Sequence, residues 1–175
     1  LNKGIARISG NSALTVFDEY EGLQETVEAI ARYKGALHLG TQDGFWRLES
    51  DNGSTQLQQI PGVQGMCWDL LPFKDNLLVA ANAEVYVYNG ENVVSLDFPT
   101  KSTVYVLKRS VVDSTLFYAG RADGIVRFRY TDGNWTFLDR IKKASYLIRS
   151  LQEEAPPKLG MPIVLWAGTR TSGAI

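Results

Sequence analysis

The stretch LHLGTQDGFWRL at residues 37–48 decides the fold, because related stretches recur along the chain. The clearest counterpart is LFYAGRADGIVRF at residues 116–128, and placing Gly40 on Gly120 also aligns an Asp-Gly pair and an arginine. The two stretches are 80 residues apart. A third stretch, LVAANAEVYVY at residues 78–88, lies midway and places Ala80 at the position of the glycine, 40 residues from each. Forty residues before Gly44–Leu48 lies the similar stretch Gly4–Ile8. Val164–Thr169 repeats the first half of the unit, with Gly168 placed 48 residues after Gly120. The pattern indicates a repeat of about 40 residues.

Each unit of this repeat predicts four short β-strands. Asp-Gly and Asn-Gly pairs separate the apolar runs, and glycine tolerates the positive φ that tight hairpins need. The pairs are Asp43-Gly44, Asn52-Gly53, Asn89-Gly90, Asp123-Gly124 and Asp132-Gly133. The expected strands, unit by unit, are Val27–Tyr33, Ala36–Thr41, Phe45–Glu49 and Thr55–Ile60; Met66–Phe73, Asn76–Ala81, Val85–Asn89 and Asn92–Phe98; Val104–Val111, Thr115–Gly120, Ile125–Tyr130 and Trp135–Ile141. Four antiparallel strands in about 40 residues form one blade of a β-propeller, so the sequence predicts an all-β propeller.

Two alternatives to the propeller are a helix in the first unit and a β-sandwich. Glu25–Tyr33 has fair helix propensity, but its counterparts Met66–Leu71 and Val104–Leu107 are apolar, aromatic and partly β-branched. A β-sandwich is also all-β, but a sandwich does not require a sequence period. We therefore expect strands throughout and almost no helix.

The chain begins and ends in the middle of a unit. Its first residues supply two strands, Gly4–Ile8 and Ala13–Asp18, and its last residues supply the other two, Ser145–Leu151 and Pro162–Gly168. We divide the propeller, residues 1–175, into a half-blade 1–20, blades at about 21–62, 63–100 and 101–143, and a half-blade 144–175. The halves add up to one blade, which permits a four-bladed ring, two chains in an eight-bladed ring, or a piece of a larger propeller. Four blades need steep inclination between neighbours, so we expect one of the latter two, with the piece of a larger propeller favoured.

Composition and charge exclude several functional classes. Hydrophobic residues make up 45% of the chain and charged residues 21%, as in folded soluble proteins. The formal net charge of −1 leaves no basic excess for nucleic acid. The longest apolar runs fall short of the about 20 residues that a membrane helix needs, and the N-terminus does not resemble a signal peptide. We expect no nucleic-acid partner and no transmembrane segment in this chain.

The repeat also resembles a known family. Residues 22–30, GLQETVEAI, begin with Gly-Leu and lead to a hydrophobic strand, and the following stretch 37–48 contains Gly-Thr and then a turn glycine. Val164–Thr169 keeps the Gly-Thr, and Asp97–Val104 fits the lead-in. These features resemble two-component regulator propeller repeats, found in the sensor regions of bacterial histidine kinases and diguanylate cyclases. The resemblance covers nearly the whole chain, although the unit with Ala80 has lost both Gly-Thr and the turn glycine.

The resemblance implies a function. It implies a non-catalytic sensor region of a signal-transduction receptor, located in the periplasm or outside the cell. Such a region would bind a small polar ligand or a carbohydrate and would act on attached or associated signalling domains. Two other classes stay open, namely a carbohydrate-active propeller enzyme or its relative, and a protein-interaction scaffold. Self-association through the two half-blades is a further option.

The residues themselves carry little catalytic chemistry. His38 is the only histidine, which excludes a two-histidine metal site, and Cys67 lies in an apolar run that suggests simple burial. Glu153 and Glu154 precede two prolines and are expected in a solvated loop. The sequence contains no P-loop, dinucleotide-binding or nucleophile-elbow motif. We expect no enzymatic activity, no metal and no cofactor.

Polar residues lie in the loops that a propeller gathers on one face around its central channel. These loops join the second strand to the third, and each fourth strand to the next blade. Polar groups on rigid strand ends suit the recognition of a small polar molecule. The candidate ligand-binding residues are Gln42, Asn82, Glu84, Lys101, Arg121, Asp123 and Arg170. Arg121 is the most unusual of them, because threonine holds its place in two other units.

Overall fold

The described part of the chain is all-β and propeller-like. The computed structural model describes residues 5–7, 15–17, 25–51, 54–63, 65–142, 144–156 and 161–175. Within these ranges the chain forms strands, turns and bends, and no helix. In the region 25–33, for which a helix was the rival prediction, residues Val27–Tyr33 form a strand. In this described part there is consequently no helix that could cross a membrane.

Three four-stranded antiparallel sheets follow one another, each with its strands in chain order. We call them blades 1, 2 and 3, and a two-stranded sheet lies on either side of them in sequence. Blade 1 consists of β3 (Val27–Tyr33), β4 (Ala36–Thr41), β5 (Gly44–Asp51) and β6 (Ser54–Gln59). Blade 2 consists of β7 (Cys67–Phe73), β8 (Asn76–Ala81), β9 (Val85–Tyr88) and β10 (Val93–Ser95). Blade 3 consists of β11 (Val104–Arg109), β12 (Leu116–Arg121), β13 (Gly124–Thr131) and β14 (Asn134–Arg140).

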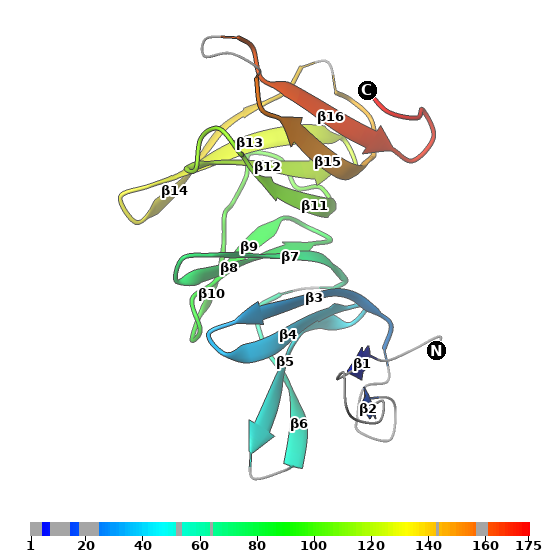
Figure 1. Ribbon diagram of the computed structural model, residues 1–175, viewed down its shortest axis with the longest axis vertical. Coiled ribbons are helices and arrows are strands. Elements are labelled where there is room, and N and C mark those ends of the chain that lie inside the picture. The colour runs from blue at the N-terminus through cyan, green and yellow to red at the C-terminus, as the bar shows by residue number, and fades with distance from the viewer. Residues whose placement is uncertain are drawn as a thin grey trace.

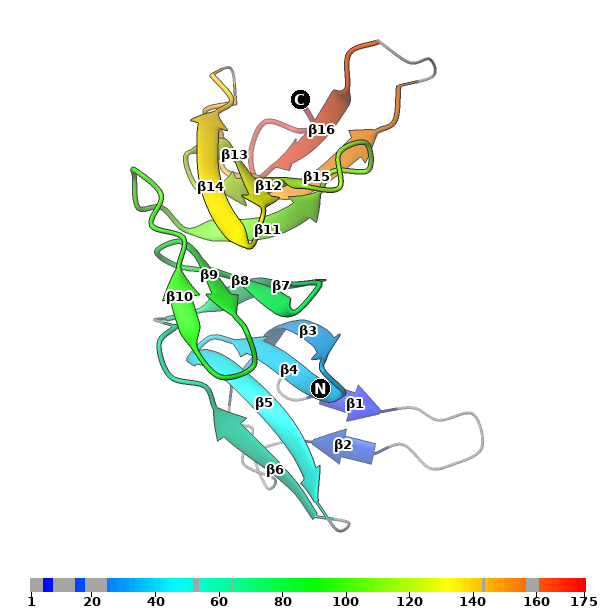
Figure 2. The ribbon, with the colours of Figure 1, turned by 90° about the vertical axis from the view of Figure 1, so that its left-hand side faces the viewer.

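The two remaining sheets are pairs of strands. β1 (Ile5–Arg7) pairs with β2 (Thr15–Phe17), inside the two strands expected at the N-terminus, whose other residues lie outside the described ranges. β15 (Ile148–Glu154) pairs with β16 (Val164–Thr169). Figures 1 and 2 show the two pairs toward opposite ends of the stack, so the described strands do not close into a single-chain ring. The alternatives of two chains or a larger propeller stay open.

The blades stack through their first strands. β3 packs against β7, β7 against β11, and β11 against β15, so these four strands run along one side of the stack (Figure 1). Each of the four contains the same irregularity of register, for example between Val27 and Ala29 in β3 and between Val104 and Val106 in β11. Such a β-bulge turns one extra side chain out of the ladder and increases the local twist.

Glycine recurs at one position of the repeat, on the second strand of a unit, and this recurrence has a steric cause. Gly40 on β4 lies under the first strand of the next blade, where an added Cβ would be 2.8 Å from the backbone oxygen of Cys67. At Gly120 on β12 an added Cβ would lie 2.5 Å from Val106 of the same blade and 2.7 Å from Ile148 of β15. Blade 2 has Ala80 at the matching register and buries its methyl group completely. The second strand of a blade therefore carries a very small residue where the next blade approaches it.

The hydrophobic core consists of successive layers between blades. The layer between blades 2 and 3 is rich in aromatic rings, with Phe117 4.8 Å from Phe73 and 5.0 Å from Trp135 between ring centroids, both edge to face. Other layers lie between blades 1 and 2 and between blade 3 and the β15–β16 pair. Each of these three layers needs side chains from two sheets, and blade 1 adds a smaller cluster of its own around Leu39.

Two expectations about local structure were wrong. Glu153 and Glu154 do not lie in a solvated loop, because the first strand of the last unit ends at residue 154 and not at Leu151. Glu153 is 1% exposed and accepts hydrogen bonds from Ser110 Oγ at 2.9 Å, from Tyr118 Oη at 2.8 Å and from the Val111 amide. All three donors belong to blade 3, so Glu153 connects the last pair of strands to that blade. Burial of the Tyr118 side chain raises its pKa to about 12. The fourth strand of blade 2, expected to extend to Phe98, ends at Ser95 before the positive φ of Asp97.

We predict that Gly40→Ala lowers the free energy of unfolding by about 1–3 kcal/mol, because its Cβ has to displace the backbone of β7. Equilibrium urea denaturation followed by circular dichroism measures this difference. Thr136→Ala, at an exposed position of β14, is the control and should change stability by less than about 0.5 kcal/mol. Equal effects of the two substitutions would contradict the steric explanation.

Candidate functional site

The residues predicted to bind a ligand lie at one end of the strands, and most of them contact one another or the next blade. Glu84 is buried and accepts a hydrogen bond from Lys101 Nζ at 2.5 Å. This bond raises the pKa of Lys101. Arg121 is 1% exposed, lies 3.0 Å from Asp123 and donates to the Thr100 carbonyl at 2.9 Å. Burial lowers the pKa of Arg121.

The other three predicted residues are less closely involved in such contacts. Asn82 is exposed, and its side-chain oxygen accepts a hydrogen bond from Trp68 Nε1 at 3.0 Å. Gln42 is exposed in the β4–β5 turn of blade 1, and Arg170 is exposed just after β16, three units further along the stack. The structure therefore brings Glu84 to Lys101 and Arg121 to Asp123 without gathering all seven residues. Ligand binding at this end of the strands stays a prediction.

An aromatic platform near Asn82 was not predicted. Trp68 and Tyr105 occupy the bulge positions of β7 and β11, and their ring centroids lie 5.0 Å apart. The Arg149 guanidinium lies over both rings, at 4.7 and 4.2 Å from the centroids. The bulge of each first strand thus presents one side chain on the side where the blades meet.

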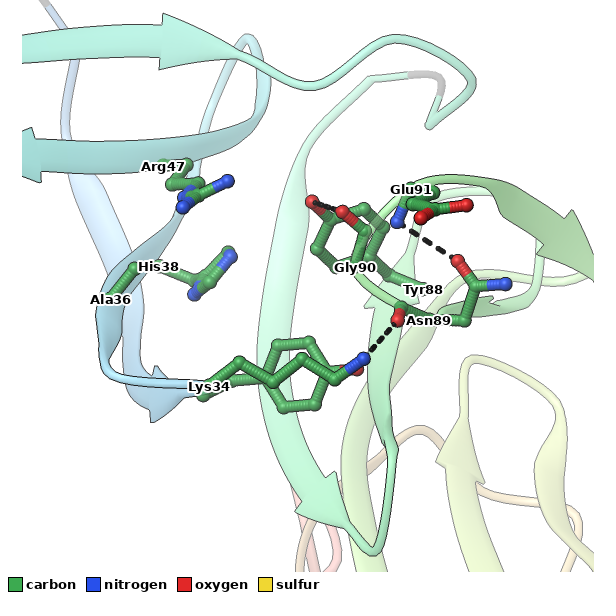
Figure 3. A pocket seen from close by; sticks show the side chains of 9 residues that line it. Lys34, Ala36, His38, Arg47, Tyr88, Asn89, Gly90 and Glu91 are labelled. Atoms are coloured by element: carbon green, nitrogen blue, oxygen red, sulfur yellow. Dashed lines mark hydrogen bonds between the residues drawn. The ribbon is translucent and has the colours of Figure 1, made fainter.

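A pocket of about 260 Å³ lies at the opposite end of the strands, between blades 1 and 2. Blade 1 contributes residues of the β3–β4 turn, of β4 and of β5, and blade 2 contributes the end of β9 and the turn after it. Figure 3 shows His38 and Arg47 side by side on one wall, with Tyr88 and the 89–91 turn opposite. The lining residues are Tyr33, Lys34, Ala36, His38, Arg47, Tyr88, Asn89, Gly90 and Glu91.

His38 is the most unusual residue of the pocket. It is 2% exposed, and its ring centroid lies 5.6 Å from those of Tyr33, Phe45 and Tyr88. Burial lowers the pKa of His38 to about 4, although a polar contact between the imidazole and the Ala36 backbone acts in the opposite direction. Neither ring nitrogen makes a hydrogen bond of normal geometry. The pocket therefore contains a neutral imidazole with one donor and one acceptor to offer.

The two cationic side chains that line the pocket, Arg47 and Lys34, differ in how many of their N–H groups already donate a hydrogen bond. Arg47 pairs with Glu49 at 3.2 Å through Nη1, but its buried Nε lacks a hydrogen-bond partner. Lys34 donates to the Asn89 carbonyl at 2.7 Å and so connects the two blades. Lys34 has a φ of 45° and precedes Gly35, whose φ of 80° completes the tight β3–β4 turn. An ammonium carries three donors, and Lys34 also hydrogen-bonds the Tyr33 hydroxyl, so one donor stays available.

Comparisons with known proteins support the fold. The chain matches no protein-family profile and no curated protein. Among solved structures it resembles the computationally designed Ika4 protein, with a TM-score of 0.64 and 20% identity over 89% of this chain and 92% of that one. It also resembles the designed Ika8 protein, with a TM-score of 0.63 and 21% identity over 88% of this chain and 46% of that one.

A natural protein shows the same likeness. The extracellular domain of BT4673 from B. thetaiotaomicron, a protein described as a one component system, has a TM-score of 0.65 and 15% identity. The match covers 95% of this chain and 25% of that domain, so the chain spans about a quarter of its length. At such identities the likeness shows the fold alone.

We predict that acidification destabilises the protein through His38. Between pH 6.5 and about pH 4 the unfolded chain binds a proton at His38 that the folded chain excludes, so stability falls as the pH falls. His38→Leu removes this effect and suits the site, because Leu78 occupies the matching register of β8. Urea denaturation at about pH 7.5 and pH 4.5 should show the wild type losing about 1–3 kcal/mol more than the variant. Thr136→Ala should follow the wild type, and parallel pH dependence of the wild type and His38→Leu would contradict the prediction.

Proposed function

We propose that this chain is a non-catalytic, ligand-binding sensor region that works outside the cytoplasm as part of a signalling receptor. The stacked four-stranded sheets support this role, and so does the likeness to the extracellular domain of a protein described as a one component system. The repeat's resemblance to two-component regulator propellers points the same way. The finer assignment to that family, and to the periplasm or the cell exterior, belongs to this proposal.

The pocket between blades 1 and 2 is the observation that carries the proposal. A buried polar atom without a hydrogen bond costs about 1–3 kcal/mol. Three such atoms, the two ring nitrogens of His38 and Nε of Arg47, belong to residues that line this one pocket. A ligand with hydrogen-bonding groups would satisfy them.

The position of the pocket suggests how binding could be transmitted. One wall comes from blade 1 and the other from blade 2, and Lys34 already crosses between them. A ligand that contacts both walls binds best at one angle between the blades, and so favours that angle. Attached or associated signalling domains would respond to the altered geometry.

A protein-interaction scaffold is the second candidate, favoured by apolar side chains at the far end of the stack. Trp166 is 52% exposed and Val164 is 43% exposed on β16. Trp166 lies two residues before Gly168, and the matching residues His38, Leu78 and Tyr118 are all buried, 4% exposed or less. Trp166 therefore occupies a position that another sheet covers in each complete blade.

The carbohydrate-active enzyme stays an alternative without a supporting observation. Three carboxylates on the channel rim would favour it. Across the described ranges there is no cluster of three or more His, Cys, Asp or Glu side chains that could hold a metal ion. We retain the non-catalytic role as the proposal.

A ligand screen tests the proposed function. Saturation-transfer NMR with a library of sugars, amino acids and small carboxylic acids should give ligands that bind the wild type and lose binding in His38→Leu. Lys101→Gln, at the opposite end of the strands, should bind the same ligands unchanged. Ligands that depend on Lys101 and not on His38 would move the site to the other end, and a library without ligands would contradict the sensor role.

A further inference from the structure

We propose that the pocket between blades 1 and 2 selects a small hydroxy carboxylate, with the carboxylate held by Arg47 and Lys34 and the hydroxyl groups held by His38, Tyr33 and Tyr88. This inference rests on the proposed function, because it names the class of ligand for the same pocket. It follows from the donors and acceptors that the protein leaves unused there.

Arg47 supplies the first reason for a carboxylate. Its Nη1 pairs with Glu49 at the exposed side, whereas Nε is buried and has no hydrogen-bond partner. A planar guanidinium binds a carboxylate through parallel N–H donors, so an oxygen at Nε would complete its hydrogen bonding. Figure 3 shows Arg47 directly above His38 on the same wall.

Lys34 supplies a second positive charge from the edge of the pocket. The turn at Lys34 and Gly35 holds its backbone, and the bond from Nζ to the Asn89 carbonyl fixes its end. Glu91 is the one acidic side chain among the lining residues, and His38 is neutral. The lining residues alone carry a net charge of +1, which suits a ligand with a single negative charge, while Glu49, the partner of Arg47, lies outside the lining.

The two tyrosines explain why the ligand should also carry hydroxyl groups. Tyr33 Oη donates to the Asp75 carbonyl at 2.5 Å, and Tyr88 Oη donates to the Gly90 carbonyl at 2.8 Å. Each hydroxyl has thereby used its proton and can only accept, and the Tyr33 oxygen already accepts one hydrogen bond from Lys34. The unprotonated nitrogen of His38 is a third acceptor. A simple carboxylate has no proton to offer these groups, whereas a hydroxy acid does.

The size of the pocket limits the ligand. Sites for drug-sized ligands are about 300–1,000 Å³, and this pocket holds about 260 Å³. The ligand is therefore about as large as one sugar ring or smaller. Sugar acids and short hydroxy acids meet all three conditions of charge, hydroxyl groups and size.

Calorimetric titration with matched probes tests the inference. The protein is titrated at about pH 7.5 with sodium D-glucuronate, sodium D-gluconate and sodium L-lactate, and with the neutral partners D-glucose, sorbitol and propane-1,2-diol. We expect at least one acid to bind about tenfold or more tightly than its neutral partner. If no acid exceeds its partner, the inference is overturned.

Variants locate the binding. Arg47→Gln should weaken the preferred acid by about 10- to 100-fold, the usual worth of a hydrogen bond to a charged group. Lys34→Gln should also weaken it. Lys74→Gln is the matched control, because Lys74 has a φ of 50° in the equivalent turn of blade 2 and does not line the pocket, and it should leave affinity unchanged. Circular dichroism confirms that each variant is folded.

The outcomes separate this inference from the proposed function. Equal binding of an acid and its neutral partner, lost in His38→Leu, would overturn the carboxylate preference and keep the pocket as a ligand site. Binding of an acid that Arg47→Gln leaves unchanged would also overturn it, since the acid would then bind elsewhere. If none of the six probes binds, the inference fails, while the wider ligand screen still decides the proposed function.

Discussion

The close approach of each blade to the second strand of the preceding one is the constraint on which the rest of the structure depends. At Gly40 and Gly120 the next blade lies so near that even a methyl group would collide with it. At the junction of blades 2 and 3 the matching residue is the buried Ala80, and there the large rings of Phe73, Phe117 and Trp135 interlock. Glycine or alanine on the second strand thus accompanies the close packing at each of these junctions.

The repeat allowed most of the fold to be predicted, because strands separated by Asp-Gly and Asn-Gly turns follow from local chemistry. The ends of strands were harder to predict. The polar run at residues 152–154 has the composition of a loop, and it forms a strand because Ser110 and Tyr118 of another blade satisfy Glu153. β-Bulges leave no mark in the composition, so the platform of Trp68 and Tyr105 could not be read from it.

The candidate site was less predictable than the fold. The loops rich in polar residues attracted attention, yet Glu84 and Arg121 are largely occupied by Lys101, Thr100 and Asp123. The pocket at the other end is assembled from two units of the repeat, and a sequence does not reveal which turns meet across a blade boundary. One indication existed, because His38 occupies the register where blade 2 has Leu78 and blade 3 has Tyr118. A histidine in a position of large packed side chains is a polar group that the core itself does not require.

Stacking through neighbouring faces has a consequence for cooperativity. Blade 1 packs against blade 2, blade 2 against blade 3, and blade 3 against the β15–β16 pair, so this part of the protein is close to a one-dimensional array. In such an array stability is a sum of unit energies and nearest-neighbour couplings, and disturbances fade with distance along the stack. A molecule wedged between blades 1 and 2 would stiffen that junction strongly and the junction beyond blade 3 only weakly. A structural change caused by a ligand in the pocket would therefore affect most strongly the elements that are attached nearest to blades 1 and 2.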